Sequence, residues 1–413
     1  MTILRHDVSA PSVPQLDDLD LYRPHFDEEL VARATALVPL IREHAAESSA
    51  NRAVSPVVMQ ALEDAELLNL FVPHRFGGHE ATMRTSMEVL AEIARGDGST
   101  AWAASLLNVC TWFATTFSVE AQNDVFGTNP HAKVSGIFTP GSSMTRVDGG
   151  YLVSGRWPYS SGSFAADWAA LGIAMDVPEG EDPRALALFS RDQFTIEPTW
   201  FVTGMKGSGS DTIVLENQFV PDHRVQRFVD MREAQYLTPF ADTERNANMA
   251  FIPVAALVLI SPQLGLARHA LELTVQKLPG KPVAYTRYTQ AKNSPAHQLG
   301  VAAAATKFRL AELLAGEAAD IIDLNAVLRQ LPDQATRARI RNDTGIVAEL
   351  VKDGIDALLT ANGAGSFAEA NVFSRIWRDA EIAGRHAYVS PEVGKEVYGR
   401  VLLGADDALT MDI

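Results

Sequence analysis

The spacing between apolar residues changes twice along this chain, and this limits the fold more than any other feature of the sequence. In residues 27–48, apolar side chains recur at three- and four-residue steps, namely Leu30, Ala34, Leu37, Ile41 and Ala45. This repeat predicts an amphipathic helix. A second helix should begin at Ser55-Pro56, with serine at the cap and proline in the first turn. Two more helices are expected at about 82–95 and 98–117.

The middle third has a different period. Short β-branched or alternating runs such as "KVSGIFTP", "GGYLVSGRW" and "DTIVLENQFVP" are bounded by Gly, Pro and Asp between about residues 130 and 228. They predict six or more short strands in a compact β-sandwich or barrel. Strands and helices do not alternate here, so a parallel doubly wound sheet is not expected.

Helical spacing returns from about residue 236 and continues to the end. Segments near 251–277, 295–329, 335–361, 370–390 and 393–403 predict a bundle of long helices of the four-helix type. We therefore expect a mostly α, α+β protein with three domains. These are an N-terminal helical domain (1–130), a central β-domain (131–228) and a C-terminal helical bundle (229–413).

Charge and apolar content exclude several classes of partner. Lys and Arg number 35 against 51 Asp and Glu, a net charge of -16, so nucleic acid and anionic membrane surfaces are poor partners. The apolar run from Ala250 to Ile260 contains Pro253 and is far shorter than the roughly 20 residues of a membrane span. The single cysteine, Cys110, cannot form an intramolecular disulfide. It fits a reducing compartment, and we expect a cytoplasmic protein.

Several chemical motifs are absent from the sequence. No HExxH, paired CxxC or strand-linked GxGxxG occurs, so neither a metal site nor a nicotinamide-binding Rossmann unit is expected. The glycines of "GMKGSGSD" (204–211) lie between predicted strands and do not open a helix. They are interpreted as turn glycines.

Two segments carry polar groups in unexpected places. In "SGRWPYSSGSFAADW" (154–168), Ser160 and Ser161 stand where the surrounding sequence predicts buried β-structure. Taken alone, they indicate an edge strand that ends in a turn. His386 follows "RIWRDAEIAGR" on a predicted late helix with Trp377 and Ile382 nearby. Taken alone, it indicates a hydrogen-bonded structural histidine.

Three longer phrases change both interpretations. "LEDAELLNLFVPHRFGG", "GMKGSGSDTIVLENQFVPDHRV" and "NGAGSFAEANVFSRIWRDAEI" occur in the order found in acyl-CoA dehydrogenases, and the chain resembles that fold from about residue 30 onward. The dehydrogenases carry a Tyr-Glu-Gly-Thr after the last phrase, whose glutamate is the catalytic base. Here "RHAYVS" follows instead. With "GRWPYSSG" and "YGRVLLGAD", this departure resembles the oxygenase component of two-component flavin-dependent monooxygenases.

The resemblance implies roles for particular residues. The segment from Trp157 through Ser160, Ser161 and Gly162 is expected to lie against the flavin. There a hydroxyl or backbone N–H would bond to N5, and glycine would permit close approach. His386 would accept a phenolic proton near neutral pH or hydrogen-bond the flavin peroxide. Weaker cofactor candidates are Thr139, Ser142, Arg287, Gly363 and Gly365. The substrate-pocket candidates are Asn108, Trp112 and Phe113.

The resemblance also implies the chemistry and the partners. It implies reduced FMN or FAD supplied by a separate NAD(P)H-dependent reductase, O2 as co-substrate, a C4a-hydroperoxyflavin, and hydroxylation of a small, phenolic aromatic in a homotetramer. N-hydroxylation, S-oxidation and, less readily, acyl-CoA dehydrogenation remain alternatives, as does a catalytically silent scaffold.

Overall fold

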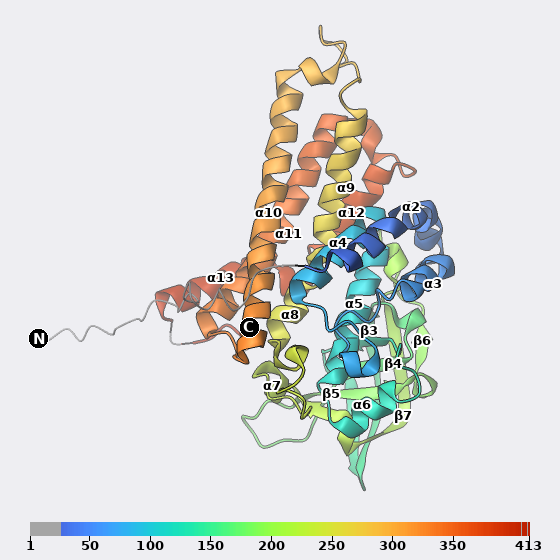
Figure 1. The fold of residues 1–413 in the computed structure, drawn as a ribbon, viewed down its shortest axis with the longest axis vertical. Coiled ribbons are helices and arrows are strands. Elements are labelled where there is room, and N and C mark those ends of the chain that lie inside the picture. Colours follow the sequence, from blue (N-terminus) through green and yellow to red (C-terminus); the bar gives the residue numbers. More distant parts are fainter. Residues whose placement is uncertain (1–25, 406, 411) are drawn as a thin grey trace, which may run out of the picture.

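The computed structural model describes residues 26–405, 407–410 and 412–413. Figure 1 shows a long helical bundle at one end, a β-domain at the other, and N-terminal helices beside the junction between them. The N-terminal helices are α2 (Glu28–Asn51), α3 (Pro56–Asp64), α4 (Met83–Gly96), α5 (Gly98–Thr115) and α6 (Val119–Phe126).

Helix α5 is the central element of this part. All but one of its eighteen residues are buried, because it contacts α4, α9 and the β-domain together. Its N-cap is Asp97, whose Oδ2 accepts hydrogen bonds from the backbone N and the Oγ1 of Thr100, both at 2.9 Å. Helix α5 therefore lies between the β-domain and the bundle and contacts both.

Two four-stranded sheets form the β-domain, in the strand orders β1-β4-β5-β8 and β2-β3-β7-β6. Trp157, Phe189, Phe194 and Ile213 are buried in a separate apolar core that both sheets contribute to. All pairings are antiparallel except β1 with β4, which is parallel. The strands are β1 (Val134–Ile137), β2 (Ser142–Val147), β3 (Gly150–Ser160), β4 (Trp168–Ala174), β5 (Arg184–Ser190), β6 (Thr195–Glu197), β7 (Asp211–Pro221) and β8 (Val225–Arg227).

The C-terminal part is helical. Its elements are α7 (Phe228–Arg232), α8 (Phe251–Leu257), α9 (Ser261–Lys277), α10 (Pro295–Leu328), α11 (Gln334–Asn362), α12 (Val372–Ala383) and α13 (Pro391–Leu403). By length and composition the described stretch Phe251–Lys277 could cross a membrane, but 94% of its most apolar window is buried inside the protein. A core helix passes the same test.

Three helical predictions differ from the structure. The predicted helix 251–277 is interrupted at residues 258–260, so α8 and α9 are separate. The predicted helix 370–390 ends at Ala383, which places His386 beyond the helix rather than on it. Pro56 does stand in the first turn of α3, but the side chain of Ser55 makes no capping hydrogen bond.

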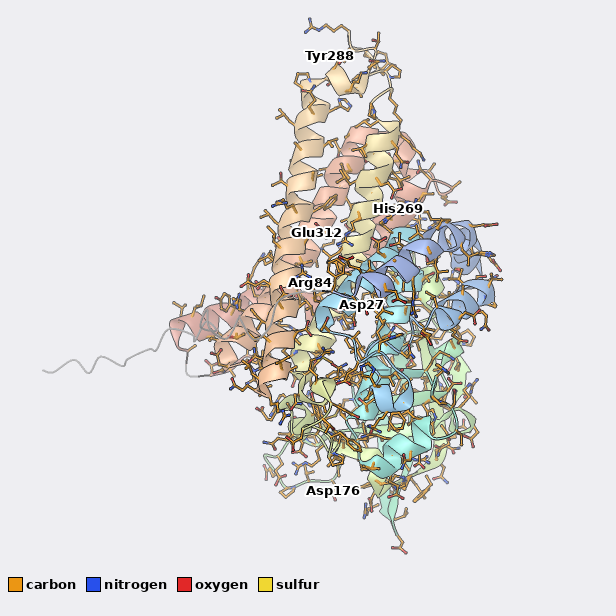
Figure 2. All side chains as sticks on the ribbon, viewed as in Figure 1. Asp27, Arg84, Asp176, His269, Tyr288 and Glu312 are labelled. Atoms are coloured by element: carbon orange, nitrogen blue, oxygen red, sulfur yellow. The ribbon has the colours of Figure 1, made fainter. Side chains whose placement is uncertain are left out.

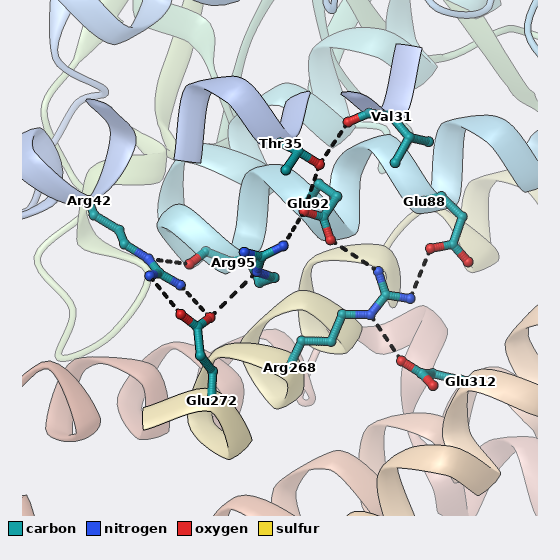
Figure 3. Close-up of polar contacts among 9 residues, drawn as sticks. All are labelled: Val31, Thr35, Arg42, Glu88, Glu92, Arg95, Arg268, Glu272 and Glu312. Carbon is teal, nitrogen blue, oxygen red and sulfur yellow. Dashed lines mark hydrogen bonds and ion pairs between the residues drawn. The ribbon is translucent and has the colours of Figure 1, made fainter. Parts of the chain in front are cut away.

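An ion network joins the N-terminal helices to the bundle (Figure 3). Arg268 of α9 pairs with Glu88 and Glu92 of α4 and with Glu312 of α10, at 2.8, 3.6 and 2.9 Å. Glu272 of α9 pairs with Arg42 of α2 and with Arg95 of α4. We call Arg42, Glu88, Glu92, Arg95, Arg268, Glu272 and Glu312 the interlayer ion network.

Candidate active site

The Ser160–Gly162 segment lies at the end of β3, where the chain leaves the strand. The β3–β7 register shifts between Trp157 and Ser160, and Tyr159 has a positive φ of 69°. A non-glycine residue in this conformation is unusual and turns the chain sharply out of the strand. Gly162 also has a positive φ, of 72°. The backbone conformation of this turn therefore favours glycine at position 162.

The donors of this segment are bound within the protein. The Ser160 hydroxyl donates to the Trp157 carbonyl at 2.9 Å. The Ser161 N–H donates to the Tyr159 carbonyl, and the Gly162 N–H donates to the Ser208 carbonyl. We predicted from the sequence that this segment offers a donor to a flavin. All three groups have acceptors within the protein, and contact of this segment with a flavin stays a prediction.

Ser161 belongs to a row of buried hydroxyls. Its Oγ lies 2.7 Å from Ser210 Oγ, which lies 2.8 Å from Ser208 Oγ, and the Ser208 hydroxyl donates to the Met205 carbonyl at 2.8 Å. At the other end, Trp102 Nε1 of α5 donates to Ser161 Oγ at 3.1 Å. We call Trp102, Ser161, Ser210 and Ser208 the hydroxyl chain.

The loop 204–210 holds this chain against α12. The backbone N–H of Met205 donates to Asp379 Oδ1 at 2.6 Å. A Cβ at Gly204 would lie 2.0 Å from the Arg378 carbonyl oxygen, so only glycine fits there. The glycines of "GMKGSGSD" therefore serve a close approach between the loop and a helix, beyond the turns predicted from the sequence.

Trp102 connects the hydroxyl chain to His386. The two ring centroids are 5.9 Å apart, and the His386 ring stacks on Tyr388 with centroids at 6.2 Å. His386 caps a short 3-10 turn, where its Nδ1 accepts the Tyr388 N–H at 3.2 Å. In the neutral imidazole the proton is then assigned to Nε2, so the free side of the ring is a hydrogen-bond donor.

The acidity of His386 differs from the value expected from the sequence. Burial, assisted by the nearby positive charge of Arg341, lowers the pKa of His386 to about 4. At neutral pH the ring is therefore uncharged and a weak proton acceptor. This corrects our expectation that His386 titrates near neutrality, and it favours hydrogen bonding over general-base catalysis.

Arg341 of α11 gives this corner a positive potential. Its guanidinium lies over the Tyr388 ring at 4.2 Å, and its Nη2 donates to the Ala387 carbonyl at 3.0 Å. Its Nε and Nη1 are buried and make no hydrogen bond to any described residue. A buried cation with free donors stabilises an anionic oxygen nearby.

Two buried carboxyl groups lie behind the loop. Asp379 Oδ2 is buried with no hydrogen-bond partner among the described residues. Burial, followed by the nearby carboxyl group of Asp97, raises the pKa of Asp379 to about 7. Arg375 lies 3.5 Å from Asp97 and offsets part of this effect. Asp379 therefore anchors Met205 while partly protonated at neutral pH.

Several predicted site residues lie elsewhere. Trp157 is in the core between the sheets, and its Nε1 donates to the Gly172 carbonyl, so its contact with the cofactor stays a prediction. The Asn108 amide bonds the backbone of Leu67, Leu70 and Ala104, and its place in the substrate pocket likewise stays a prediction. Ser142 pairs with Gly155, five residues before Ser160 on β3, a separation of roughly 16 Å at the usual rise per residue. Thr139 is exposed.

The remaining cofactor candidates belong to the helical bundle. Arg287 is exposed, and Figure 2 places its neighbour Tyr288 at the end of the bundle opposite Asp176 of the β-domain. Within one chain Arg287 therefore does not meet Ser161. Gly363 and Gly365 lie in an exposed turn after α11, where Gly363 has a φ of 82°. They too do not join the hydroxyl chain.

Trp112 and Phe113 belong to a buried aromatic cluster. Phe113 lies 5.0 Å from Phe138 and 4.7 Å from Phe251, and Phe228 packs edge-on against Phe251 at 5.5 Å. Arg184 lies over Phe228 at 4.5 Å. It also lines a cleft of about 600 Å³ together with Arg227, Arg232 and Asp412. The aromatic cluster thus reaches the wall of this cleft, and contact of Trp112 and Phe113 with a substrate stays a prediction.

Sequence reasoning missed most of the partners of Ser161. Ser208 and Ser210 stand in a segment that we interpreted by its glycines. Trp102 stands six residues, about 1.7 turns, before Asn108 on α5. A tryptophan N–H needs an acceptor when it is buried, and that requirement is the signal that could have identified Trp102.

Comparisons with known proteins show which family the chain is similar to. Residues 22–126 match the acyl-CoA dehydrogenase N-terminal domain and residues 257–391 match the C-terminal domain. The chain is 31% identical over 369 residues to the flavin-dependent monooxygenase oxygenase subunit HsaA of Rhodococcus jostii, covering 89% of this chain and 96% of the relative. It is 30% identical to the oxygenase component of an FADH(2)-dependent resorcinol hydroxylase of a Rhizobium species, covering 93% and 96%.

A solved structure shows the same likeness in three dimensions. XiaF from a Streptomyces species, in complex with FADH2 and glycerol, superposes with a TM-score of 0.88 at 31% identity, covering 95% of this chain and 98% of that one. The fold class predicted from the sequence is confirmed. With these matches over most of its length, the chain belongs to the flavin-dependent monooxygenases built on the acyl-CoA dehydrogenase fold, as an oxygenase component.

Proposed function

We propose that this enzyme hydroxylates a small phenolic substrate, using O2 and reduced FMN or FAD supplied by a separate NAD(P)H-dependent reductase. The observation that carries the proposal is the joining of Ser161, Trp102 and His386 at one corner of the molecule, where the imidazole of His386 is uncharged at neutral pH. The relative named for resorcinol, a phenol, supports the substrate class. The absence of a GxGxxG motif after a strand supports a separate reductase.

In this proposal Ser161 and its neighbours would hold the flavin ring, which would supply oxygen as a C4a-hydroperoxide. The residues around it exclude water and hold hydrogen bonds, which such a species requires in order to persist. His386 Nε2–H donates a hydrogen bond to the peroxide or to the substrate. Arg341 favours the phenolate form of the substrate, because its guanidinium is buried and has free donors.

Two alternatives differ in their support. An acyl-CoA dehydrogenase requires a carboxylate base after α12, and residues 384–390 contain none. N-hydroxylation and S-oxidation would use the same flavin site, so they differ from the proposal only in the product. Analysis of the oxygenated product from phenols, amines and thiophenes separates these reactions.

Rapid mixing tests the main proposal. The protein with reduced flavin is mixed with oxygenated buffer, and absorbance is followed for a transient flavin species before oxidised flavin appears. A panel of phenols is then screened for hydroxylated product. Direct flavin oxidation without a transient, together with no phenol product, would contradict the proposal.

Variants of His386 test its role. His386→Ala removes a hydrogen bond, and we expect the coupling of oxygen to product to fall roughly 5- to 150-fold. His386→Asn retains a donor and should keep most of the coupling between pH 6 and 9. If the asparagine variant is as inactive as the alanine variant while melting normally, His386 acts through proton transfer instead.

We also propose that the protein assembles as a tetramer through its C-terminal helices. Helix α10 exposes Leu299, Leu310 and Leu313, and α13 exposes Leu402 and Leu403, which is more apolar surface than these helices need inside one chain. In such an assembly Arg287 could reach the flavin of another subunit. Light scattering that shows a monomer at micromolar concentration would contradict the tetramer.

A further inference from the structure

The last residues of the chain lie against the β-domain. Asp412 bonds Arg184 of β5 through two parallel contacts, from Nη1 to Oδ2 at 2.6 Å and from Nη2 to Oδ1 at 2.9 Å. Its neighbour Ile413 is buried against α11 and α13. The Ile413 carbonyl accepts a hydrogen bond from Arg337 Nη1 at 3.3 Å. The pair between Asp412 and Arg184 therefore ties the end of the chain to a strand of the other domain.

This pair lies in the cleft of about 600 Å³ described above, which we call the arginine cleft. Its charged lining residues are three cations and three anions, namely Arg184, Arg227, Arg232, Glu181, Asp182 and Asp412. Arg184 pairs with Asp182 at 2.8 Å, and Arg227 pairs with Glu181 at 3.0 Å. These four residues all belong to the β-domain, whereas Asp412 comes from the end of the chain. Without the Asp412 carboxylate, the lining of the cleft would carry one positive charge in excess.

Several arginines near Asp412 have donors that the protein does not use. The Nε groups of Arg227, Arg337 and Arg341 are buried and make no hydrogen bond to any residue that the structure describes. Arg232, whose side chain is 8% exposed, lies 3.9 Å from Asp412. Buried guanidinium groups favour an oxyanion, and their planar fork matches a carboxylate in particular. The surroundings of Asp412 are therefore suited to a carboxylate, whether it belongs to the protein or to a ligand.

The arginine cleft borders the residues of the candidate active site. Burial, with the charge of Asp412, raises the pKa of the Tyr388 hydroxyl to about 12, so Asp412 is close enough to act on this ring. The Tyr388 ring in turn stacks on His386. On another side, Arg184 lies over Phe228 of the buried aromatic cluster at 4.5 Å. An aromatic ligand with an acidic group thus finds apolar and cationic surfaces next to each other.

We propose that the arginine cleft binds a carboxylate group of the phenolic substrate, in the place that Asp412 occupies in this structure. Arg184 would hold the ligand carboxylate in the same parallel geometry, with Arg232 beside it. A group with one negative charge fits, because the exchange leaves the balance of charge in the cleft unchanged. The side chains of Arg184 and Asp412 are 29% and 20% exposed, so the exchange does not require the core to open. This inference rests on the proposed hydroxylation of a phenol.

Binding of matched acids and amides tests the inference without turnover. 4-Hydroxybenzoate and 3-(4-hydroxyphenyl)propanoate differ in reach, and each is compared with its neutral amide. Calorimetry measures their affinities for the intact protein, with and without anaerobically reduced FMN. Asp412→Asn removes the competing carboxylate but keeps its size. We expect this variant to bind at least one acid roughly 5- to 13-fold more tightly than the parent does, the range between an exposed ion pair and a charge-assisted hydrogen bond. Its affinity for the amide should not change.

Two further variants show whether the effect belongs to the cleft. Asp407→Asn breaks another ion pair of the same segment, with Arg400 at 2.9 Å, outside the arginine cleft. It should keep the parent affinities. Adding Arg184→Gln to Asp412→Asn should abolish the gain for the acid. Equal affinities for acid and amide in both the parent and Asp412→Asn, or the same gain in Asp407→Asn, would overturn the inference.

Inorganic phosphate tests a different oxyanion at the same arginines. If phosphate binds Asp412→Asn more tightly than either acid does, the cleft is a phosphate site and the carboxylate assignment is wrong. Hydroxylation of neutral phenols tests the proposed function separately. If neutral phenols are hydroxylated while the acids show no advantage in binding, this inference alone fails. If the acids bind as expected but no phenol is hydroxylated, the carboxylate site remains and the proposed function fails.

Discussion

The hydroxyl chain and the interlayer ion network solve the same structural task with opposite chemistry. Each joins elements that are far apart in the sequence. The hydroxyl chain links α5, β3 and the loop 204–210 through uncharged groups whose residues are at most 7% exposed. The ion network links α2, α4, α9 and α10 through charged side chains that are up to 43% exposed (Figure 3).

The difference shows that this protein places charged side chains at the partly exposed interface between helices and uncharged hydroxyls in the buried hydroxyl chain. Ion pairs are strong at short range but have no donor-to-acceptor direction. In a row of hydroxyls, a single carbonyl acceptor can set the direction in which each hydroxyl donates. The network also affects its surroundings. Burial and the charge of Arg42 lower the pKa of nearby His269 to about 3.

The largest effect is expected where the hydroxyl chain is anchored. Gly204→Ala would place a methyl group 2.0 Å from the Arg378 carbonyl and push the loop away from α12. We expect a loss of about 3 kcal/mol in the free energy of unfolding, since backbone must move. Gly300→Ala is the control, because a Cβ at this helical glycine meets nothing within 4 Å. Urea denaturation measures the effect. Equal free energies of unfolding for the two variants would show that the close approach of Gly204 to α12 does not stabilise the protein.

The next effect concerns the ion network. Arg268→Gln leaves Glu88, Glu92 and Glu312 without their shared cation. We expect a loss of about 2–3 kcal/mol at low salt, and a smaller loss at high salt because the repulsion between carboxylates is screened. Arg146→Gln, which breaks an exposed pair with Asp222, should cost less than about 1 kcal/mol. A cost that does not depend on salt would show that Arg268 acts by packing.

A smaller effect should appear in acid. The hydrogen bonds and charge of Arg42, with the charge of Arg95, lower the pKa of Glu272 to about 2. Because the folded-state value is depressed, this stabilisation is complete above the unfolded value and is lost as pH falls toward 2. Glu272→Gln should be less stable than the parent at pH 7 by roughly 1–2 kcal/mol, and this gap should close by about pH 2. Melting temperatures across pH 2–7 measure the gap.

The sequence predicts the elements of the two regions better than their contacts. The repeat of Leu30, Ala34 and Ile41 correctly indicates α2, because helical spacing is a local property. The Ser160–Gly162 turn is likewise visible in its residues. By contrast, the bond between Trp102 and Ser161 joins residues 59 positions apart, and no local pattern encodes it.

Where the structure adds to what the sequence indicates about His386 and Asn108, the physical causes are of the same kind. His386 was expected to titrate near neutrality because imidazole does so in water, and only the packed structure reveals the burial that lowers its pKa. Asn108 follows the helical spacing of Trp112 but turns its amide to the backbone at Leu67 and Leu70. Burial decided the first case and side-chain direction the second, and both arise from tertiary contacts.

The smallest effect concerns the one acidic group that touches the loop of the hydroxyl chain. Burial and Asp97 raise the pKa of Asp379 to about 7, so the folded state holds a proton that the unfolded state releases above about pH 4. Its contribution to stability is present at low pH and is lost as pH rises through about 7. Asp379→Asn keeps an oxygen for the Met205 N–H but cannot ionise, so relative to the parent it should gain about 1 kcal/mol between pH 6 and pH 7. Asp222→Asn, at the surface, should show no such gain. A stability difference for Asp379→Asn that is constant over this range would mean that Asp379 is ionised throughout. An ion pair between Asp379 and Arg375 would then hold the loop beside Ser161. The contrast between an uncharged hydroxyl chain and a charged ion network would not hold at Asp379.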